Sequence, residues 1–312
     1  RAATARTVAF QQGRLNDLFT WINLNRPRGP ITNIQALMHR QRMSGTLSNY
    51  HAGFISLTKR LSHGLTFTLN YTLSQSLDQF GLNQEQSSVL SSAFDFNIDY
   101  GPSSWDRRHV LNAYWYYDLP FGRGRLSAGT ALDKVIGGWY TSGIFTANSG
   151  LPLTVGQHPQ VWGASPNNLS ITAGAIPIRK PDFGNSVNRG VRGSGGVGIS
   201  GDPARGGSGL NLFTNPEAVF KNFRPILISQ DTRHGRGVLR GLPRWNADLS
   251  IGKKTTITES VRMVFALDLI NAFNHVEFND PSLSLLNPAA FGVLTSQFAG
   301  PRALQFGLRI EF

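Results

Sequence analysis

The clearest feature of this sequence is an alternation of apolar and polar residues with a period of two. In residues 65–74 every odd position is apolar and every even position is polar, and residues 302–312 repeat the alternation up to the C-terminus. Two further apolar rows run through residues 244–254 and 260–271. Strict alternation is typical of a β-strand that has one apolar face and one wet face.

The pattern predicts seven full strands, with residues 5–10 as the end of an eighth. Most of the seven are roughly 11 residues long, which is the length that a tilted strand needs to cross a bilayer. Strands of soluble antiparallel sheets usually have about five or six residues, so the length favours a membrane protein over a soluble β-sandwich. The predicted strands cover residues 50–60, 65–77, 108–119, 138–150, 244–254, 260–271 and 302–312.

The connections between these strands alternate between short and long ones. Outer-membrane β-barrels have short periplasmic turns and long extracellular loops. If the C-terminus is periplasmic, every long connection of this chain lies outside the cell, an order that a soluble sandwich has no reason to keep. Residues 61–64 and 255–259 are short turns and 120–137 is intermediate, whereas 78–107, 155–243 and 272–301 are long.

Composition agrees with a protein rich in turns. Only 15% of the residues are charged, and Gly (34 residues) and Pro (16 residues) are abundant. No stretch reaches 18 consecutive apolar residues, which excludes a transmembrane helix. The absence of Cys excludes disulfides and thiolate metal sites. Residues 1–6 do not resemble a signal peptide, and we expect the chain to begin within a longer protein.

The formal net charge of +12 raises the question of a nucleic-acid partner. The positive charge is scattered over the predicted connections, mostly as Arg, and neither a basic helical stripe nor a nucleic-acid-binding motif occurs. We therefore predict no nucleic-acid partner. The segment 155–243 is Gly-rich and carries ten Lys or Arg against four Asp or Glu. Its basic excess suits phosphates of lipopolysaccharide or an anionic ligand, and a solvated irregular loop is the simpler alternative.

Aromatic residues gather near the ends of the predicted strands, where girdles at the two bilayer interfaces would place them. Ordinary strand composition explains any single one of them equally well. They are Trp105, Tyr114, Trp115, Tyr116, Tyr117, Phe121, Trp139, Tyr140, Trp245, Phe273 and Phe312.

A series of ordered segments carries a family resemblance. Each segment is weak alone, and their order and spacing make the set specific over residues 48–312. The segments are Ser48–Ala52, Leu57–Phe67, Asn70–Asp78, Tyr100–His109, Tyr117–Gly122, Gly137–Trp139, Ser149–Leu153, Asn271–Asn274 and the terminal Phe312. Together they resemble the C-terminal barrel of TonB-dependent transporters of the Oar-like kind, which often carry a carboxypeptidase-regulatory-like domain upstream.

The resemblance implies an all-β fold: an antiparallel transmembrane barrel of about 22 strands that surrounds an N-terminal plug. It also implies ligand import energised by the TonB–ExbB–ExbD complex. We therefore assign residues 1–312 to one partial barrel domain, about a third of that wall, and we predict an open, curved sheet for it. The plug and the TonB box of the family are not in this sequence. The implied location is the bacterial outer membrane, with its lipid and lipopolysaccharide as partners.

Two groups of residues are the candidate functional positions. The C-terminal row resembles the signal read by the barrel-assembly machinery, and it consists of Phe306, Leu308, Ile310 and Phe312. Charges on the polar rows imply a wet or plug-filled interior, and they are Asp248, Arg262, Asp268, Arg309 and Glu311. Because Arg262 begins one predicted strand and Glu311 ends the next, we predict a charge pair between Arg262 and Glu311 or a carboxylate close by.

No catalytic, cofactor-binding or metal site is predicted, and we expect no enzyme. Residues 196–201 match GxGxxG, but the surrounding Gly and Ser predict a loop in place of a strand and a helix. The seven His residues show no HExxH spacing, and residues 231–234 (Asp-Thr-Arg-His) have no nucleophile partner. Asp95, Asp99 and Asp106 could bring carboxylates together for calcium in the connection 78–107, but they lack the Asp-x-Asp-x-Asp-Gly spacing of a calcium loop, so no calcium site is predicted.

Three rivals to a transporter remain open at the level of sequence. A structural or adhesive outer-membrane protein would use the same barrel to display residues 155–243. A small, complete barrel of eight strands would need residues 5–10 as part of its eighth strand. A soluble carbohydrate-binding sandwich is the most distant alternative.

Overall fold

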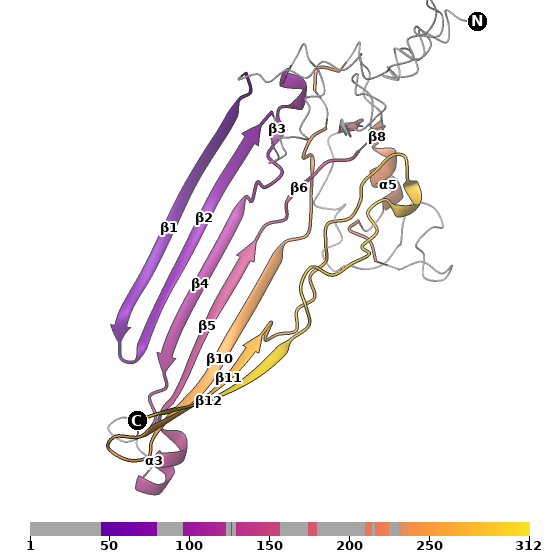
Figure 1. Cartoon of the computed structure of the whole chain (residues 1–312). Helices are drawn as coiled ribbons and strands as arrows, with labels where there is room; N and C mark the ends of the chain where they lie inside the picture. Colours follow the sequence, from indigo (N-terminus) through magenta and orange to yellow (C-terminus); the bar gives the residue numbers. More distant parts are fainter. Residues whose placement is uncertain are drawn as a thin grey trace, which may run out of the picture.

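One antiparallel sheet dominates the computed structural model of this protein (Figure 1). Its seven long strands are β1 (Ser48–Ser62), β2 (Leu65–Asp78), β4 (His109–Asp118), β5 (Trp139–Asn148), β10 (Arg244–Thr256), β11 (Arg262–Ile270) and β12 (Ala303–Glu311). The structure describes residues 45–79, 96–122, 126, 129–156, 174–179, 210–213, 216–224, 231–233 and 235–312. All seven predicted full strands are confirmed, with ends that shift by a few residues. The predicted strand at 5–10 lies outside the described residues.

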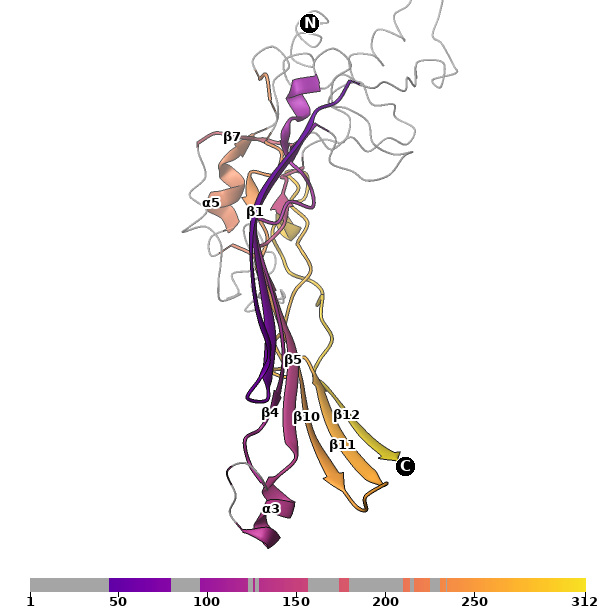
Figure 2. The ribbon, with the colours of Figure 1, turned by 90° about the vertical axis from the view of Figure 1, so that its left-hand side faces the viewer.

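Sequence neighbours among the long strands are also neighbours in the sheet. The order is β1-β2-β4-β5-β10-β11-β12, and the two-residue β3 (Gly101–Pro102) pairs with the end of β2. Within the described residues β1 pairs with β2 alone and β12 with β11 alone, which agrees with the predicted open sheet. Figure 2 shows that β10, β11 and β12 bend away from the plane of the other strands, so the sheet is curved.

The strand register sorts the alternating rows onto two faces of the sheet. Phe265 stands opposite Leu308 on one side and Lys253 on the other, and Leu69 stands opposite Leu57 and Ala113. Followed across all seven strands, the register places the predicted apolar rows on one surface, here called the apolar face. The polar face carries the alternate positions, among them Thr66, Thr68, Gln305 and Arg309. The predicted division of residues 65–77 and 302–312 is confirmed.

The two ends of the sheet differ in their connections. The short-turn end holds the β1–β2 turn at residues 63–64, the β10–β11 turn at 257–261, the chain's C-terminus and helix α3 (Thr130–Ile136). The opposite, loop end holds short elements: η2 (Phe96–Asp99), β6 (Pro152–Leu153), β7 (Ile176–Pro177), α5 (Pro216–Lys221), β8 (Phe223–Arg224), β9 (Leu239–Arg240) and η4 (Pro288–Ala290). Among the described residues, no helix has the length and apolar character that crossing a membrane requires.

The buried apolar core lies at the loop end and not on the sheet. We call it the cap core, and it packs residues of the β5–β10 connection against residues of the β11–β12 connection. It consists of Val155, Ala175, Leu212, Phe213, Val219, Phe223, Leu239, Leu283 and Phe291. Described pieces of residues 155–243 therefore bury apolar side chains in this core, whereas the interpretation of the whole segment as an irregular loop stays a prediction. The remainder of that segment, including most of its Gly-rich part, lies outside the described residues.

The sheet, in contrast to the loop end, leaves a large row of apolar side chains exposed. Phe306 and Leu308 on β12 are 69% and 66% exposed, and no other layer of the described chain covers them. Such an area is unusual on a water-soluble monomer, where contiguous apolar patches are small. Contact with lipid hydrocarbon explains why these rows are apolar and yet uncovered.

We expect the two faces to respond differently to a charge. Leu69→Arg places a guanidinium on the apolar face near the middle of β2, where lipid contact makes it cost about 2–4 kcal/mol. Asn70→Arg places the same group on the polar face and should cost much less. The comparison is made by urea titration of the complete barrel carrying either variant, reconstituted into phospholipid vesicles. Equal losses of stability in both variants would contradict the assignment of the faces.

Candidate functional site

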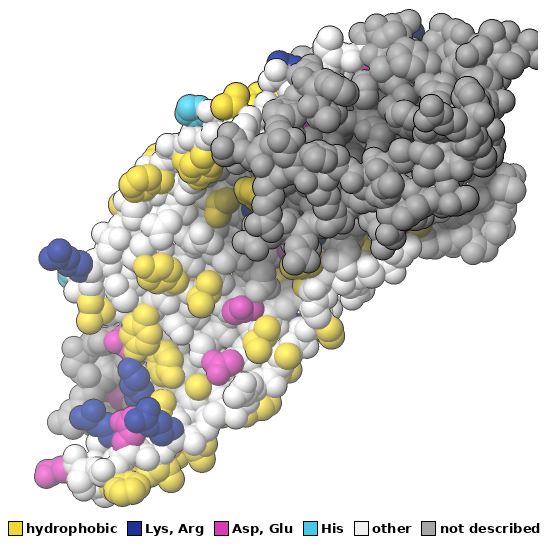
Figure 3. Space-filling model, turned by 45° about the horizontal axis from the view of Figure 1, so that its top comes forward, with side chains coloured by type: hydrophobic (Ala, Val, Ile, Leu, Met, Phe, Trp, Pro, Cys, Tyr) yellow, Lys and Arg dark blue, Asp and Glu magenta, His cyan; other side chains and the backbone are white. Residues whose placement is uncertain are grey.

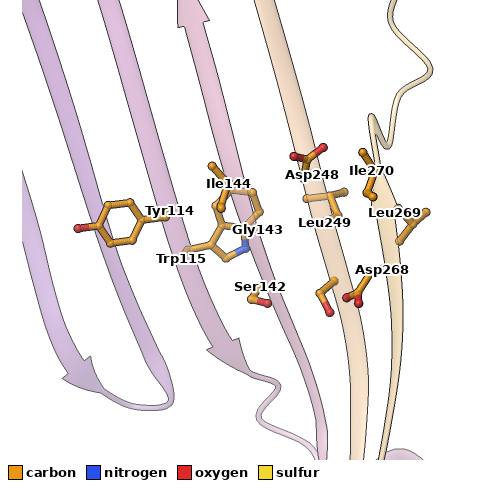
Figure 4. A pocket seen from close by; sticks show the side chains of 11 residues that line it. Tyr114, Trp115, Ser142, Gly143, Ile144, Asp248, Leu249, Asp268, Leu269 and Ile270 are labelled. Carbon is orange, nitrogen blue, oxygen red and sulfur yellow. The ribbon is translucent and has the colours of Figure 1, made fainter. Parts of the chain in front are cut away.

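A shallow depression of about 340 Å³ lies on the sheet between β4 and β11. The residues that line it from the polar face are Tyr114, Ser142, Ile144, Asp248, Ser250, Asp268 and Ile270. The strand positions between them, Trp115, Gly143, Leu249 and Leu269, complete the lining. Asp248 on β10 and Asp268 on β11 lie on neighbouring strands along this depression (Figure 4). Figure 3 shows acidic side chains near the middle of one sheet face, and basic side chains together with acidic ones near its lower left end.

Backbone and amide donors fix the carboxylate of Asp248. The side chain of Asn246 donates to Asp248 Oδ1 over 2.9 Å, and the backbone N–H of Asn271 donates to the same oxygen over 2.8 Å. Asp268 stands opposite Ser250 on β10 and Gln305 on β12. The predicted polar-row positions of Asp248 and Asp268 thus place two carboxylates in one depression. A wall of this kind suits contact with water or with a polar occupant better than contact with lipid.

A second polar group lies on the same face near the short-turn end, and the sequence analysis missed it. Tyr116 Oη donates to Asp118 Oδ1 over 2.6 Å, and Lys254 Nζ donates to Tyr116 Oη over 2.7 Å. The ammonium group of Lys254 also lies 4.9 Å from the ring centre of Tyr140, within the range of a cation–π contact. The signal in the sequence was the placement of Tyr116, Asp118, Tyr140 and Lys254 on polar rows of three strands.

The predicted charge pair of the last hairpin is correct in register and wrong in partner. Arg262 stands directly opposite Glu311, and both lie on the polar face. However, the carboxylate of Glu311 lies 3.3 Å from Nε of Arg309, its neighbour two positions along the same strand. Among the described residues, Arg262 forms no ion pair. The side chains of Arg309 and Glu311 are 77% and 40% exposed, so this pair adds little stability.

The candidate assembly signal occupies one row of β12. Phe306, Leu308 and Ile310 share the apolar face with Met263, Phe265 and Leu267 of β11, and each is more than half exposed. Phe312, which follows the strand, is fully exposed. The row is therefore presented outward at the edge of the described sheet.

The segment around Trp105–His109 ties the loop end to the tops of the strands. Asp106 is buried: its Oδ1 accepts the backbone N–H of Ser76 over 2.7 Å, and its Oδ2 pairs with Arg240. Arg240 Nη1 also donates to the backbone carbonyl of Asp106 over 3.0 Å. Because β9 carries Arg240, this contact joins the β5–β10 connection to β2 and β4. It also gives Asp106 a structural role as the partner of an arginine.

Arg236 forms a second, more deeply buried link. It pairs with the carboxylate of Asp78 at the end of β2, and the side chains of Arg236 and Asp78 are only 9% and 7% exposed. Its Nη1 donates to the backbone carbonyls of Asp78 (2.9 Å) and Asp99 (2.8 Å). One guanidinium thus binds two separate segments of the β2–β4 region and holds them against the β5–β10 connection.

The segment Asn271–Asn274 forms the turn in which the chain leaves β11. Asn271 and Asn274 have positive φ angles of 50° and 51°, a conformation that Asn tolerates better than most residues. Buried Asn271 donates to the carbonyls of His275 and Gly300 and accepts from the N–H of His275. Beside this turn, the ring of Trp245 stacks on that of His275 at 4.2 Å, as expected of an aromatic girdle at this end.

The structure also places two further residues that the sequence analysis considered. Asp231 forms a two-point ion pair with Arg224, with both N–O distances at 2.7 Å. Asp99 lies in η2 beside Arg236. His234, Asp95 and residues 196–201 lie outside the described residues.

We expect the buried pair of Arg236 to stabilise the loop end strongly. Arg236→Met leaves the buried carboxylate of Asp78 without its arginine, which should cost about 3–5 kcal/mol. Arg309→Met, which removes an exposed pair, should cost at most about 1 kcal/mol. Amide exchange of residues 235–243 and thermal unfolding measure both effects. Equal behaviour of the two variants would show that the buried pair does not hold the loop end.

Asp280 should give the loop end a pH dependence. Burial raises the pKa of Asp280 above its ordinary value of 3.8, although the nearby positive charges of Arg244 and Arg107 oppose the shift. The folded protein therefore binds this proton more tightly than the unfolded chain does. The contribution of Asp280 to the free energy of unfolding is complete below pH 3.8 and falls as the pH rises through the folded pKa.

The variant Asp280→Asn lacks this titration, so its stability relative to the native protein should improve as the pH rises above 3.8. A series of thermal unfolding experiments at different pH values, with both proteins, measures the difference. A stability difference that stays constant from pH 3 to pH 7 would contradict the assignment.

Comparison with known proteins agrees with this geometry. Residues 10–305 match the family model described as an outer membrane beta barrel domain. No curated protein and no solved structure matches the chain. The match covers nearly the whole chain and includes all seven long strands, at least in part. The chain therefore belongs to the outer membrane beta barrel domain family, and its place is the bacterial outer membrane.

Proposed function

We propose that this protein is part of a TonB-dependent receptor that imports a ligand across the outer membrane, with the chain forming a C-terminal portion of the barrel wall. The observation that carries the proposal is the polar face of the sheet. Asp248, Asp268 and the Tyr116–Asp118–Lys254 group give it charges that a lipid-facing or tightly packed surface would not tolerate. A wide barrel whose interior holds water or a polar plug accommodates them.

The edges of the sheet support a wider barrel. Backbone N–H and C=O groups in a bilayer need partners within the protein, so β1 and β12 must each pair with a further strand. Within the described residues they do not pair with each other. A barrel completed by strands outside the described residues satisfies both edges, and it leaves room for a plug. A small barrel of eight strands would require both edges to meet on one additional strand.

The long connections at the loop end favour a role in contact with the cell's surroundings. In outer-membrane barrels the long connections are extracellular, which places the cap core and the Arg236 and Arg240 links outside the cell. A folded cap above the barrel interior is suited to selecting a ligand. It is equally suited to display, so an adhesive or structural barrel is the second candidate function. In either role we propose no enzymatic activity.

The partners follow from the location. Outer-membrane lipid and lipopolysaccharide would surround the apolar face. The exposed row of β12 would be read by the barrel-assembly machinery, and the TonB–ExbB–ExbD complex would act through a TonB box upstream of the barrel.

The test compares three strains of the native bacterium: one without this gene, one without TonB, and one carrying the gene with Asp248→Asn and Asp268→Asn. All are grown on a defined mixture of metal chelates, oligosaccharides and peptides, and depletion of each compound is followed by mass spectrometry. We expect the first two strains to share a defect for the same class of compound. The third should import that class more slowly with an unchanged amount of barrel at the surface.

A different result would assign the protein to display. In that case the deletion strain would consume every compound at the normal rate and would lose attachment to surfaces or to other cells.

A further inference from the structure

Helix α3 is a seven-residue element in the β4–β5 connection, at the periplasmic end of the sheet. Within its sequence Thr-Ala-Leu-Asp-Lys-Val-Ile, the charged Asp133 and Lys134 fall on one side of a helical projection. Leu132, Val135 and Ile136 fall on the other, because residues three and four apart share a helix face. The helix is therefore amphipathic, although it is short.

Contacts from the apolar face of the sheet hold the end of α3. Lys253 lies on that face, opposite Trp139 and Phe265. Its ammonium group donates to the backbone carbonyls of Val135 (2.6 Å) and Gly137 (2.8 Å), and the indole N–H of Trp139 donates to the carbonyl of Val135 over 2.9 Å. These bonds satisfy carbonyls that a helix leaves free at its C-terminus. They also fix α3 on the lipid side of the barrel rim and not on its interior side.

Two glycines allow close backbone contacts at the C-terminal end of α3, one with the sheet and one with the β4–α3 connection. Gly138 has a φ of 74°, and a Cβ there would meet the carbonyl oxygen of Lys254 at 2.2 Å. A Cβ on Gly122 would lie 2.6 Å from Cα of Gly137. The approach of α3 to the sheet is thus built into the backbone.

The apolar side of α3 is nevertheless uncovered. Leu132 and Val135 are 57% and 65% exposed. Ile257 in the adjoining β10–β11 turn is 57% exposed as well. These side chains continue the lipid-facing surface past the first residue of β5 and the last residues of β10, with Trp139 at the junction. Tryptophan at such a position is typical of the boundary between hydrocarbon and headgroups.

We propose that α3 is an interfacial anchor, which inserts Leu132 and Val135 among the acyl chains of the periplasmic phospholipid leaflet and leaves Lys134 in water. Phospholipid is the partner that we infer for α3, because its apolar side continues the lipid-facing surface and because the helix is amphipathic. Interfacial helices place an apolar side among the acyl chains and a charged side among the headgroups in this way. Lys253 is a cation on a lipid-facing row. Its ammonium group is stabilised there because the carbonyls at the end of α3 accept its hydrogen bonds.

The absence of Cys from the sequence allows a direct test. Single variants Leu132→Cys, Val135→Cys and Lys134→Cys are labelled with a bimane fluorophore in the complete barrel that contains this chain, reconstituted into vesicles of phosphatidylethanolamine and phosphatidylglycerol. We expect brominated acyl chains to quench the labels at 132 and 135 severalfold more than the label at 134. Aqueous iodide should show the opposite order. Equal quenching at positions 132 and 134 by either quencher overturns the proposal.

A second variant tests the role of Lys253. Lys253→Met removes the two bonds to the helix carbonyls and keeps an apolar side chain on the lipid-facing row, so the barrel should still fold. In this background the label at position 132 should become severalfold more accessible to iodide. A label that stays shielded in a folded Lys253→Met protein would show that Lys253 does not hold the anchor.

Discussion

A bilayer offers no hydrogen-bond partners to the backbone, and the architecture of this protein follows from that constraint. Every N–H and C=O group in the hydrocarbon must be paired between strands, which favours long antiparallel strands joined in sequence order. The sheet is a single layer, so each strand has one row toward lipid and one toward the interior. No second layer covers the apolar row of β12 in the described structure, because lipid takes the place that a hydrophobic core would have in a soluble protein.

The same constraint explains which parts of the fold the sequence could predict. Strand positions were predictable because alternation with a period of two is imposed along the whole length of each strand. The register between Arg262 and Glu311 followed from the alternation and from the order of the strands. The ion pair of Glu311 with Arg309 was not predictable, because long, solvated side chains choose among several partners of similar energy.

Irregular segments lack such a period, and they account for what the sequence analysis missed. The cap core joins residues as far apart as Val155 and Phe291, and no local pattern marks them as neighbours. Helix α3 spans only two turns, too few for its spacing of Leu132, Val135 and Ile136 to stand out from a polar connection. The depression with Asp248 and Asp268 was predictable as a polar row, but its lining by Tyr114 and Ile144 required the pairing of strands distant in sequence.

Several of the segments that carry the family resemblance contain residues that fix the ends of strands. Asp106 anchors Arg240, Asn271 closes the turn after β11, and Gly138 lets α3 approach the sheet. These roles concern the construction of the barrel and not the recognition of a ligand. A resemblance built on such residues therefore identifies the architecture well, while the identity of the ligand depends on other parts of the protein.

The composition of the cap core has a consequence for the order in which the protein matures. Val155 and Phe223 belong to the connection before β10, whereas Leu283 and Phe291 belong to the connection after β11. Both connections must be in place before their apolar side chains can meet. Until the hairpin of β10 and β11 has formed, Phe213 and its neighbours lack part of their final cover. The cap core can therefore close only after β10 and β11 are in place, and before that its apolar side chains are open to nonspecific association.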